Sequence, residues 1–157
     1  MTPLKILAVA AVSNVFGASV WADDYNVTRT LQLAQDSADV WRRVGGFCDV
    51  DDWHPGVVEC ELKVIDGKLH RILTTDAGDR FVDQRVAKER GLSYTYRSSE
   101  TPLPVGDFIA TLSIEPIDGT QVTWSADFSA DDPTIEARVI ELIETGLAGI
   151  ESRFEAD

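Results

Sequence analysis

Chemically reactive side chains gather between Phe47 and Cys60, where the sequence FCDVDDWHPGVVEC holds several acids, a histidine and two cysteines. A calcium-binding loop starting at Asp49 would need glycine at the position of His54 and glutamate at the position of Cys60. Zinc would need paired histidine and cysteine ligands, and the chain shows none of the usual zinc spacings. We therefore expect the protein to use neither a metal nor another cofactor.

Cys48 and Cys60 are the only cysteines of the chain. In an oxidising compartment such as the bacterial periplasm, two cysteines this close in sequence can form a disulfide bond. The spacing alone does not show whether their geometry permits the bond, so two buried thiols are the alternative.

Nucleophilic catalysis is not indicated, because the sequence contains no Gly-x-Ser-x-Gly motif and both cysteines have a structural explanation. His54 could act as a general base, since the pKa of a free imidazole lies near neutrality. The alternative, which we favour, is that Trp53, His54 and Pro55 form a packed hinge before the next strand. If the protein is an enzyme, the acid/base candidates are His54, Asp83 and Tyr96.

Arg71 and Asp83 carry opposite charges in two neighbouring predicted strands, 69–75 and 80–87, which a short turn joins. The alternation of apolar residues places both side chains on the face expected to be concave. A charge in a cavity must be paired or must meet a polar ligand. The two residues can therefore form a structural ion pair or orient the polar group of a ligand, and Arg29 is a further candidate.

An aromatic set with strand spacing is expected on the same face of the sheet, and it consists of Tyr94, Tyr96, Trp124 and Phe128. Such a set can be core alone or can line a cavity. Gly146 and Gly149 remove side-chain volume from the C-terminal helical segment, where the sheet should close on it. We expect these glycines to leave room for a ligand in a mostly apolar cavity.

The elements that must position these residues follow from the period of the apolar residues. Alternating apolar and polar residues predict strands over 25–33, 58–64, 69–75, 80–87, 92–98, 108–114 and 122–128. A short helix is predicted over 36–44 and a second short helix or turn over 47–53. Apolar residues at three- and four-residue spacing predict a long helix from Asp132 to Phe154. This order indicates one α+β domain with a curved, seven-stranded antiparallel sheet wrapped around the last helix.

Residues 1–22 have the features of a cleavable signal peptide, with Lys5, a short apolar run and small residues before Asp23. We expect 23–157 to form the mature domain, exported to the periplasm or secreted. No apolar run is long enough to span a membrane. The chain has 27 acidic residues against 14 lysines and arginines, a formal net charge of −13. This charge disfavours nucleic acids and anionic membranes as partners. It can attract a basic protein surface, and the alternative is that it only keeps an exported protein soluble.

The order of these elements and several short patterns resemble the START-like helix-grip superfamily (SRPBCC), in particular its polyketide cyclase/dehydrase branch. The residues that carry the resemblance are spread over nearly all of the expected mature domain: Val40-Trp41, Phe47, Trp53-His54-Pro55-Gly56, Arg71 with Leu73, Asp83, Tyr94-Thr95-Tyr96, Pro102-Leu103-Pro104, and Val122-Thr123-Trp124 with Phe128. The size and the leader are also similar to those of small periplasmic members associated with bacterial methanol oxidation. The resemblance implies a helix-grip fold with a cavity for an apolar molecule, and it places Trp53 at the cavity mouth.

Function is not decided by this fold, because most domains of the superfamily are pockets for apolar small molecules and only some are enzymes. We expect an exported protein that binds a small apolar or amphipathic ligand through Trp53, His54, Arg71, Asp83 and the aromatic set. One alternative is an accessory protein that docks on a periplasmic redox enzyme, such as a methanol dehydrogenase system. The other is a polyketide cyclase or dehydratase.

Overall fold

The computed structural model describes residues 22–155, so the expected signal peptide lies outside the described residues except for Ala22. The elements follow one another as β1 (Asp23–Leu33), α1 (Ser37–Val44), α2 (Val50–Trp53), β2 (Val57–Ile65), β3 (Lys68–Thr75), β4 (Arg80–Glu89), β5 (Ser93–Glu100), β6 (Gly106–Glu115), β7 (Thr120–Ala130) and α3 (Thr134–Glu155). None of the helices in this part of the chain is long and apolar enough to cross a membrane.

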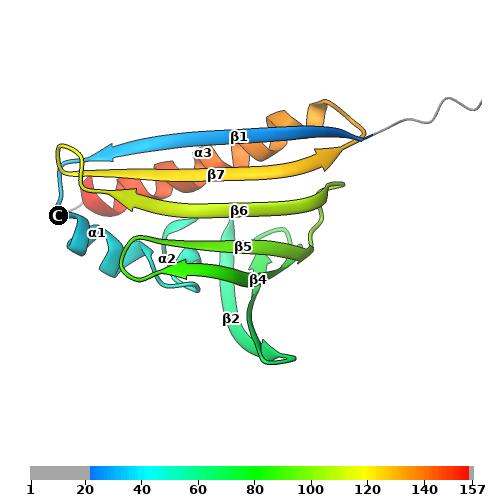
Figure 1. Cartoon of the computed structure of the whole chain (residues 1–157), viewed down its shortest axis with the longest axis horizontal. Coiled ribbons are helices and arrows are strands. Elements are labelled where there is room, and N and C mark those ends of the chain that lie inside the picture. The colour runs from blue at the N-terminus through cyan, green and yellow to red at the C-terminus, as the bar shows by residue number, and fades with distance from the viewer. Residues whose placement is uncertain (1–21, 156–157) are drawn as a thin grey trace, which may run out of the picture.

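The seven strands form one antiparallel sheet in the order β1-β7-β6-β5-β4-β3-β2 (Figure 1). The strands β1, β7 and β6 run side by side, whereas the hairpin of β2 and β3 turns steeply away from them. Register shifts between Val82 and Asp83 and between Arg85 and Ala87 interrupt the pairing of β4 with β5. Such irregularities bend a sheet, and here they lie where it turns. The predicted α+β helix-grip fold is therefore confirmed.

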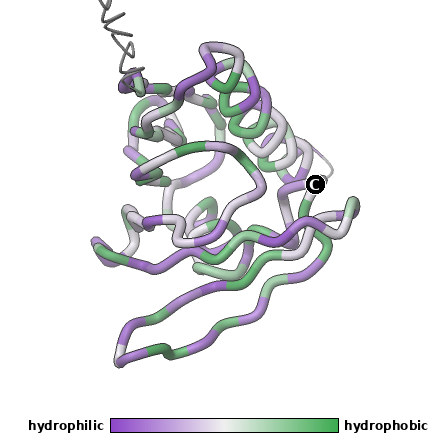
Figure 2. Tube along the Cα trace, turned by 90° about the vertical axis from the view of Figure 1, so that its right-hand side faces the viewer, coloured by the Kyte–Doolittle hydropathy of each residue, from purple (hydrophilic) through white to green (hydrophobic). Residues whose placement is uncertain are grey.

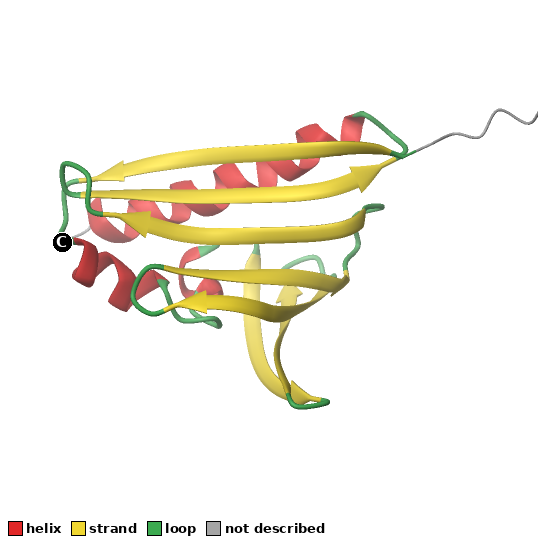
Figure 3. Ribbon diagram, in the orientation of Figure 1, coloured by secondary structure: helices red, strands yellow, loops and turns green. Residues whose placement is uncertain are grey.

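Helix α3 packs on β1 and β7 and covers one face of the sheet (Figure 3). Asp132 caps the N-terminus of this helix, because its Oδ1 atom accepts a hydrogen bond from the N–H of Thr134 at 2.8 Å. Apolar side chains at three- and four-residue spacing face the sheet and are buried. They are Ile135, Val139, Ile143, Leu147, Ile150 and Phe154, with Gly146 on the same side.

The β2–β3 hairpin differs from what its apolar alternation suggests. Alternation in β2 is typical of a strand with one buried face, yet the exposed fractions of Val58, Leu62 and Val64 are 60%, 49% and 72%. Figure 2 shows the hairpin at the bottom of the molecule, with apolar and polar residues alternating along it and helix α3 far above. The alternation predicts the strand but not its burial, because α3, which packs on β1 and β7, does not pack on this hairpin.

Candidate functional site

A cavity of about 380 Å³ lies between helix α3 and the face of the sheet that carries Arg71. Most of its wall is apolar, and it includes Leu73, Phe108 and Trp124 from three different strands. The loop 101–105, which connects β5 to β6, contributes Leu103 to the wall. The volume and the apolar lining are typical of sites for small molecules, which measure roughly 300–1,000 Å³.

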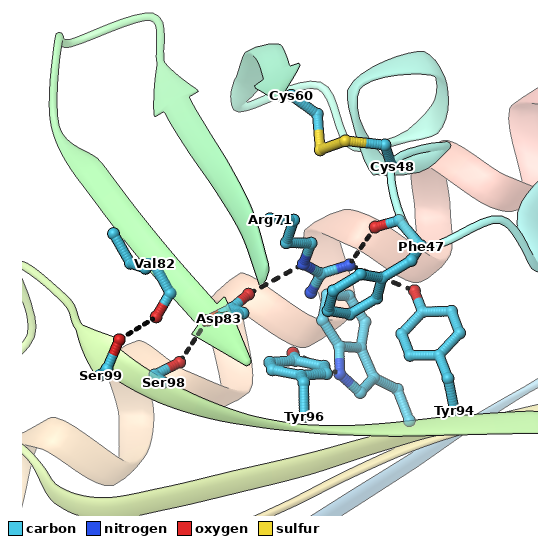
Figure 4. A network of polar contacts seen from close by, with 11 residues as sticks. Phe47, Cys48, Cys60, Arg71, Val82, Asp83, Tyr94, Tyr96, Ser98 and Ser99 are labelled. Atoms are coloured by element: carbon cyan, nitrogen blue, oxygen red, sulfur yellow. Dashed lines mark hydrogen bonds and ion pairs between the residues drawn. A yellow bond between two sulfur atoms is a disulfide. The ribbon is translucent and has the colours of Figure 1, made fainter. Parts of the chain in front are cut away.

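A buried ion pair forms the polar part of the cavity wall (Figure 4). Arg71 and Asp83 are opposite each other in the pairing of β3 with β4, so both side chains project from the same face. The Nε atom of Arg71 donates to Oδ2 of Asp83 at 2.9 Å, and both side chains are almost completely buried. Ser98 on β5 donates to the other oxygen, Oδ1, at 2.5 Å. Both oxygens of the Asp83 carboxylate are therefore occupied by partners within the protein.

The guanidinium of Arg71 is held by further contacts on its other side. Its Nη1 atom donates to the carbonyl oxygen of Phe47 at 3.0 Å and to the hydroxyl of Tyr94 at 3.4 Å. Its Cζ atom lies 4.6 Å from the ring centroid of Phe47 and 4.4 Å from that of Tyr96. A cation in this position is attracted by the negative face of the aromatic ring, so both rings stabilise the charged guanidinium. The third nitrogen, Nη2, makes no hydrogen bond with the described residues.

A disulfide joins Cys48 to Cys60 close to Arg71 and Phe47 (Figure 4). The Cα atoms of the two cysteines are 5.5 Å apart. The bond connects the loop that carries Phe47 to strand β2, and Leu62 in the same strand pairs with Arg71. The disulfide therefore holds the loop that carries the Phe47 carbonyl next to β2, close to the guanidinium that this carbonyl binds.

The electrostatic environment keeps Arg71 charged and the nearby phenols neutral. Burial disfavours the charge of Arg71, but the adjacent Asp83 carboxylate outweighs this effect and raises the pKa of the guanidinium. Burial raises the pKa of the Tyr96 hydroxyl. That hydroxyl accepts a hydrogen bond from Nε1 of Trp124 at 3.2 Å. Its own proton has no acceptor among the described residues, so it is available to a ligand.

His54 lines the cavity but both nitrogens of its ring are engaged by the backbone. Nδ1 accepts from the N–H of Gly56 at 3.1 Å, and Nε2 lies 3.1 Å from the carbonyl oxygen of Leu142 in α3. This pairing requires the neutral tautomer with its proton on Nε2. Burial lowers the pKa of the imidazole, which also favours the neutral form. His54 therefore joins the end of α2 to α3 and has no free lone pair for proton transfer.

Gly146 and Gly149 permit close packing and do not enlarge the cavity. A Cβ atom added at Gly146 would lie 2.5 Å from Cζ3 of Trp124 and 2.7 Å from Cδ2 of His54. A Cβ atom added at Gly149 would collide with the carbonyl oxygen of Trp53. The expectation that these glycines leave room for a ligand is wrong, because aromatic rings and backbone fill the space.

The predicted site residues divide into those that line the cavity and those that do not. His54, Arg71, Asp83, Tyr96 and Trp124 line it. Three predicted residues lie elsewhere: Trp53 packs edge-on against Trp124, Tyr94 lies against Arg71 and Phe47, and Phe128 stacks between Tyr25 and Phe108. Arg29 is also outside, where its Nε atom pairs with Glu144 at 2.7 Å on the surface.

Sequence analysis missed the charged residues around the cavity. Asp76 and Asp79 come from the β3–β4 turn, while Arg138 and Glu141 come from the exposed side of α3. The turn signal at 76–79 was visible in the sequence, but nothing there shows that the turn approaches the helix. Three acids against one arginine make this rim negative on balance. Within residues 22–155, no three histidine, cysteine or acidic side chains are grouped to hold a metal ion.

Several solved structures share this fold. The protein XoxI from Bacillus cereus is 23% identical with a TM-score of 0.71, over 82% of this chain and 94% of that one. The Zhui aromatase/cyclase from Streptomyces sp. R1128 is 18% identical with a TM-score of 0.70, over 85% and 94%. Ginseng major latex-like protein 151 from Panax ginseng is 17% identical with a TM-score of 0.64, over 83% and 97%. At these identities the likeness concerns the fold alone.

The sequence itself matches a family over nearly the whole described range, although no curated protein matches it. Residues 25–155 match the family described as polyketide cyclase/dehydrase and lipid transport. This match agrees with the apolar cavity and with the long helix that closes it. The chain therefore belongs to the polyketide cyclase/dehydrase and lipid transport family.

Proposed function

We propose that this protein binds a small amphipathic molecule in the cavity without transforming it. The observation that carries the proposal is a pair of unused hydrogen-bond donors, Nη2 of Arg71 and the hydroxyl of Tyr96, in a mostly apolar cavity. A ligand with an apolar body would pack on Phe108 and Trp124. Its polar end would carry an acceptor, such as a carbonyl oxygen, because the wall offers donors at this point.

The titratable side chains at the cavity are already engaged in hydrogen bonds, which supports binding over catalysis. A general acid or base needs a titratable atom that is free to reach the substrate. Both nitrogens of His54 are engaged by backbone groups, and both oxygens of Asp83 are engaged by Arg71 and Ser98. The raised pKa of the Tyr96 hydroxyl makes it a weak proton donor and leaves almost no phenolate to act as a base at neutral pH. Family membership keeps a cyclase or dehydratase as an alternative, which turnover would reveal.

A second candidate is an accessory protein that docks on a periplasmic redox enzyme, such as a methanol dehydrogenase system. The net charge of −13 favours it, because such a charge attracts a basic partner surface. Both candidates place the protein outside the cytoplasm, and that part of the proposal rests on the signal-peptide features of residues 1–22.

Two probes that differ in one group test the binding proposal. 2-Acetylnaphthalene carries a carbonyl oxygen on an apolar ring system, and 2-isopropenylnaphthalene has nearly the same shape with a CH2 group in place of that oxygen. We expect calorimetry to show tighter binding of the acetyl compound, and Tyr96→Phe to weaken that binding about fivefold, the worth of one hydrogen bond. Tyr25→Phe is the matched control, because Tyr25 stacks on Phe128 outside the cavity wall and should leave the affinity unchanged.

The same incubations separate binding from catalysis. We expect the probe to be recovered chemically unchanged by chromatography. Equal affinity for both probes, or equal effects of the two tyrosine substitutions, would contradict the proposed role of the donors. If the protein converted a polyketone or hydroxyacyl compound and His54→Ala abolished this turnover, the cyclase or dehydratase alternative would replace the binding proposal.

A further inference from the structure

Strand β2 ends the sheet with an edge that is both unpaired and apolar. No described strand lies beyond it, and Leu62, Val64 and Ile65 expose 49%, 72% and 42% of their surface. We refer to residues 60–65 as the β2 edge. Exposed edges of this kind are templates for pairing with another strand, and proteins usually protect them with charges, bulges or covering segments. Here the N–H of Cys60 donates to Oδ2 of Asp51 at 3.1 Å, and Glu61 and Lys63, which pair at 3.5 Å, are the only charges among residues 60–65.

The turn of the hairpin determines which backbone groups point outward. Asp66 and Gly67 have φ values of 50° and 74°, as in the two-residue type I′ turn. In that turn the flanking residues, Ile65 and Lys68, exchange their backbone hydrogen bonds. Hydrogen-bonded pairs alternate along an antiparallel ladder, so Leu62 and Val64 direct their N–H and C=O groups away from β3. The outward N–H of Cys60, bonded to Asp51, has the orientation that this alternation requires.

We propose that a second copy of this chain pairs with the β2 edge, antiparallel and centred on Leu62. This register is chemically self-complementary. Leu62 faces Leu62 of the other copy, and Val64 faces Cys60. Glu61 faces Lys63 in both directions, which pairs opposite charges across the strands. Both outward backbone groups of Leu62 gain partners, and the N–H of Val64 gains the carbonyl oxygen of Cys60, while the Cys60 N–H stays bonded to Asp51.

Neighbouring registers are less favourable for identifiable reasons. Centring the pair on Glu61 places two glutamates opposite each other, and centring it on Lys63 places two lysines opposite each other. Centring it on Cys60 puts the N–H that Asp51 already occupies at the middle of the pairing and sets Val64 opposite Gly56, which lies outside β2. Centring it on Val64 sets Leu62 opposite Asp66, which lies in the turn. The register on Leu62 is therefore selected by charge and by the free backbone groups.

The dimer is expected to be weak. The pairing extends over few residues, and stable interfaces bury about 1,200–2,000 Å² in total. Each copy also carries a net charge of −13, so the two copies repel each other at long range. Added salt screens this repulsion, and association should therefore increase with ionic strength. The interface would lie one strand away from Arg71, because Leu62 and Arg71 are partners in the sheet.

Cysteine cross-linking at three adjacent positions tests the register. In the proposed dimer the Cα atoms of the two Leu62 residues are about 5.5 Å apart, which is within the range of a disulfide. Under mild oxidation we expect Leu62→Cys to form covalent dimers several-fold faster than Glu61→Cys or Lys63→Cys. Peptide mass mapping must show the 62–62 bond with the Cys48–Cys60 bond intact. Equal rates at the three positions, or fastest linkage at 61 or 63, would overturn the proposal.

Charge reversal provides an independent test by sedimentation at high protein concentration. Glu61→Lys alone and Lys63→Glu alone should each dissociate the dimer, because like charges then face each other. A mixture of these two variants should form a heterodimer, and the double variant should recover self-association. Val86→Thr is the control, since Val86 is 46% exposed on β4 and away from the edge. A wild-type chain that stays monomeric at all concentrations and salt levels would also overturn the proposal.

Discussion

The two ends of the sheet carry the same apolar alternation and bury it differently. In β7, which α3 covers, every second side chain is buried from Thr120 to Phe128. In β2, at the opposite end of the sheet, the alternating Val58, Leu62 and Val64 are exposed. Apolar alternation therefore predicts a strand with one apolar and one polar face. Whether the apolar face is buried depends on another element that covers it.

The two ends also place their ion pairs differently. Arg29 of β1 pairs with Glu144 of α3 on the surface, with 37% and 56% of the side chains exposed. Arg71 and Asp83 lie in the cavity wall, with 2% and 3% exposed. The covered end excludes charge from its core, whereas the opposite half of the sheet keeps one buried pair beside the cavity. A buried pair needs its hydrogen bonds to remain stable, and a surface pair does not.

The largest expected effect comes from breaking the buried ion pair. Arg71→Met leaves the buried Asp83 carboxylate without its cation, and we expect the free energy of unfolding to fall by about 3–5 kcal/mol. Arg29→Met is the matched control and should cost at most about 1 kcal/mol, because its pair is exposed. Urea denaturation measures both values. Equal losses in the two variants would contradict the comparison.

An intermediate effect is expected from one substitution made at both ends of the sheet. Val122→Ala in β7 removes two methyl groups from a fully buried side chain and should lower the free energy of unfolding by about 2 kcal/mol. Val64→Ala in β2 removes the same atoms from an exposed side chain and should change it by at most about 0.5 kcal/mol. Urea denaturation of dilute protein keeps any dimer out of the comparison. A similar loss in both variants would show that the β2 edge is covered in solution.

The smallest expected effect concerns pH and His54. Burial lowers the pKa of the folded imidazole below its usual value of about 6.5, so the unfolded chain binds a proton that the folded chain does not. This contribution to stability is complete above pH ~6.5 and is lost as the pH falls below that value. Urea denaturation between pH 7.5 and pH 5.5 should show a steeper loss for the wild type than for His54→Gln. Parallel curves for the two proteins would contradict a buried neutral histidine.

Much of the site could be predicted because short-range features determine it. The short turn between β3 and β4 limits the register of the two strands, and alternation then places Arg71 and Asp83 on one face. Burial of two opposite charges on one face requires them to meet, as they do. The same reasoning does not distinguish Tyr94 from Tyr96. Both project from the same face of β5 and both are buried, yet only Tyr96 lines the cavity.

The sequence by itself determined the order of the strands and helices, because apolar period and turn residues are local properties of the chain. It also determined that one arginine and one aspartate share a face of the sheet. Only the tertiary structure decided that Trp124 and His54 fill the space at Gly146, that the β3–β4 turn approaches α3, and that the β2 edge stays open. These outcomes depend on the position and reach of α3 across a curved sheet, and contacts between segments far apart in sequence set that geometry.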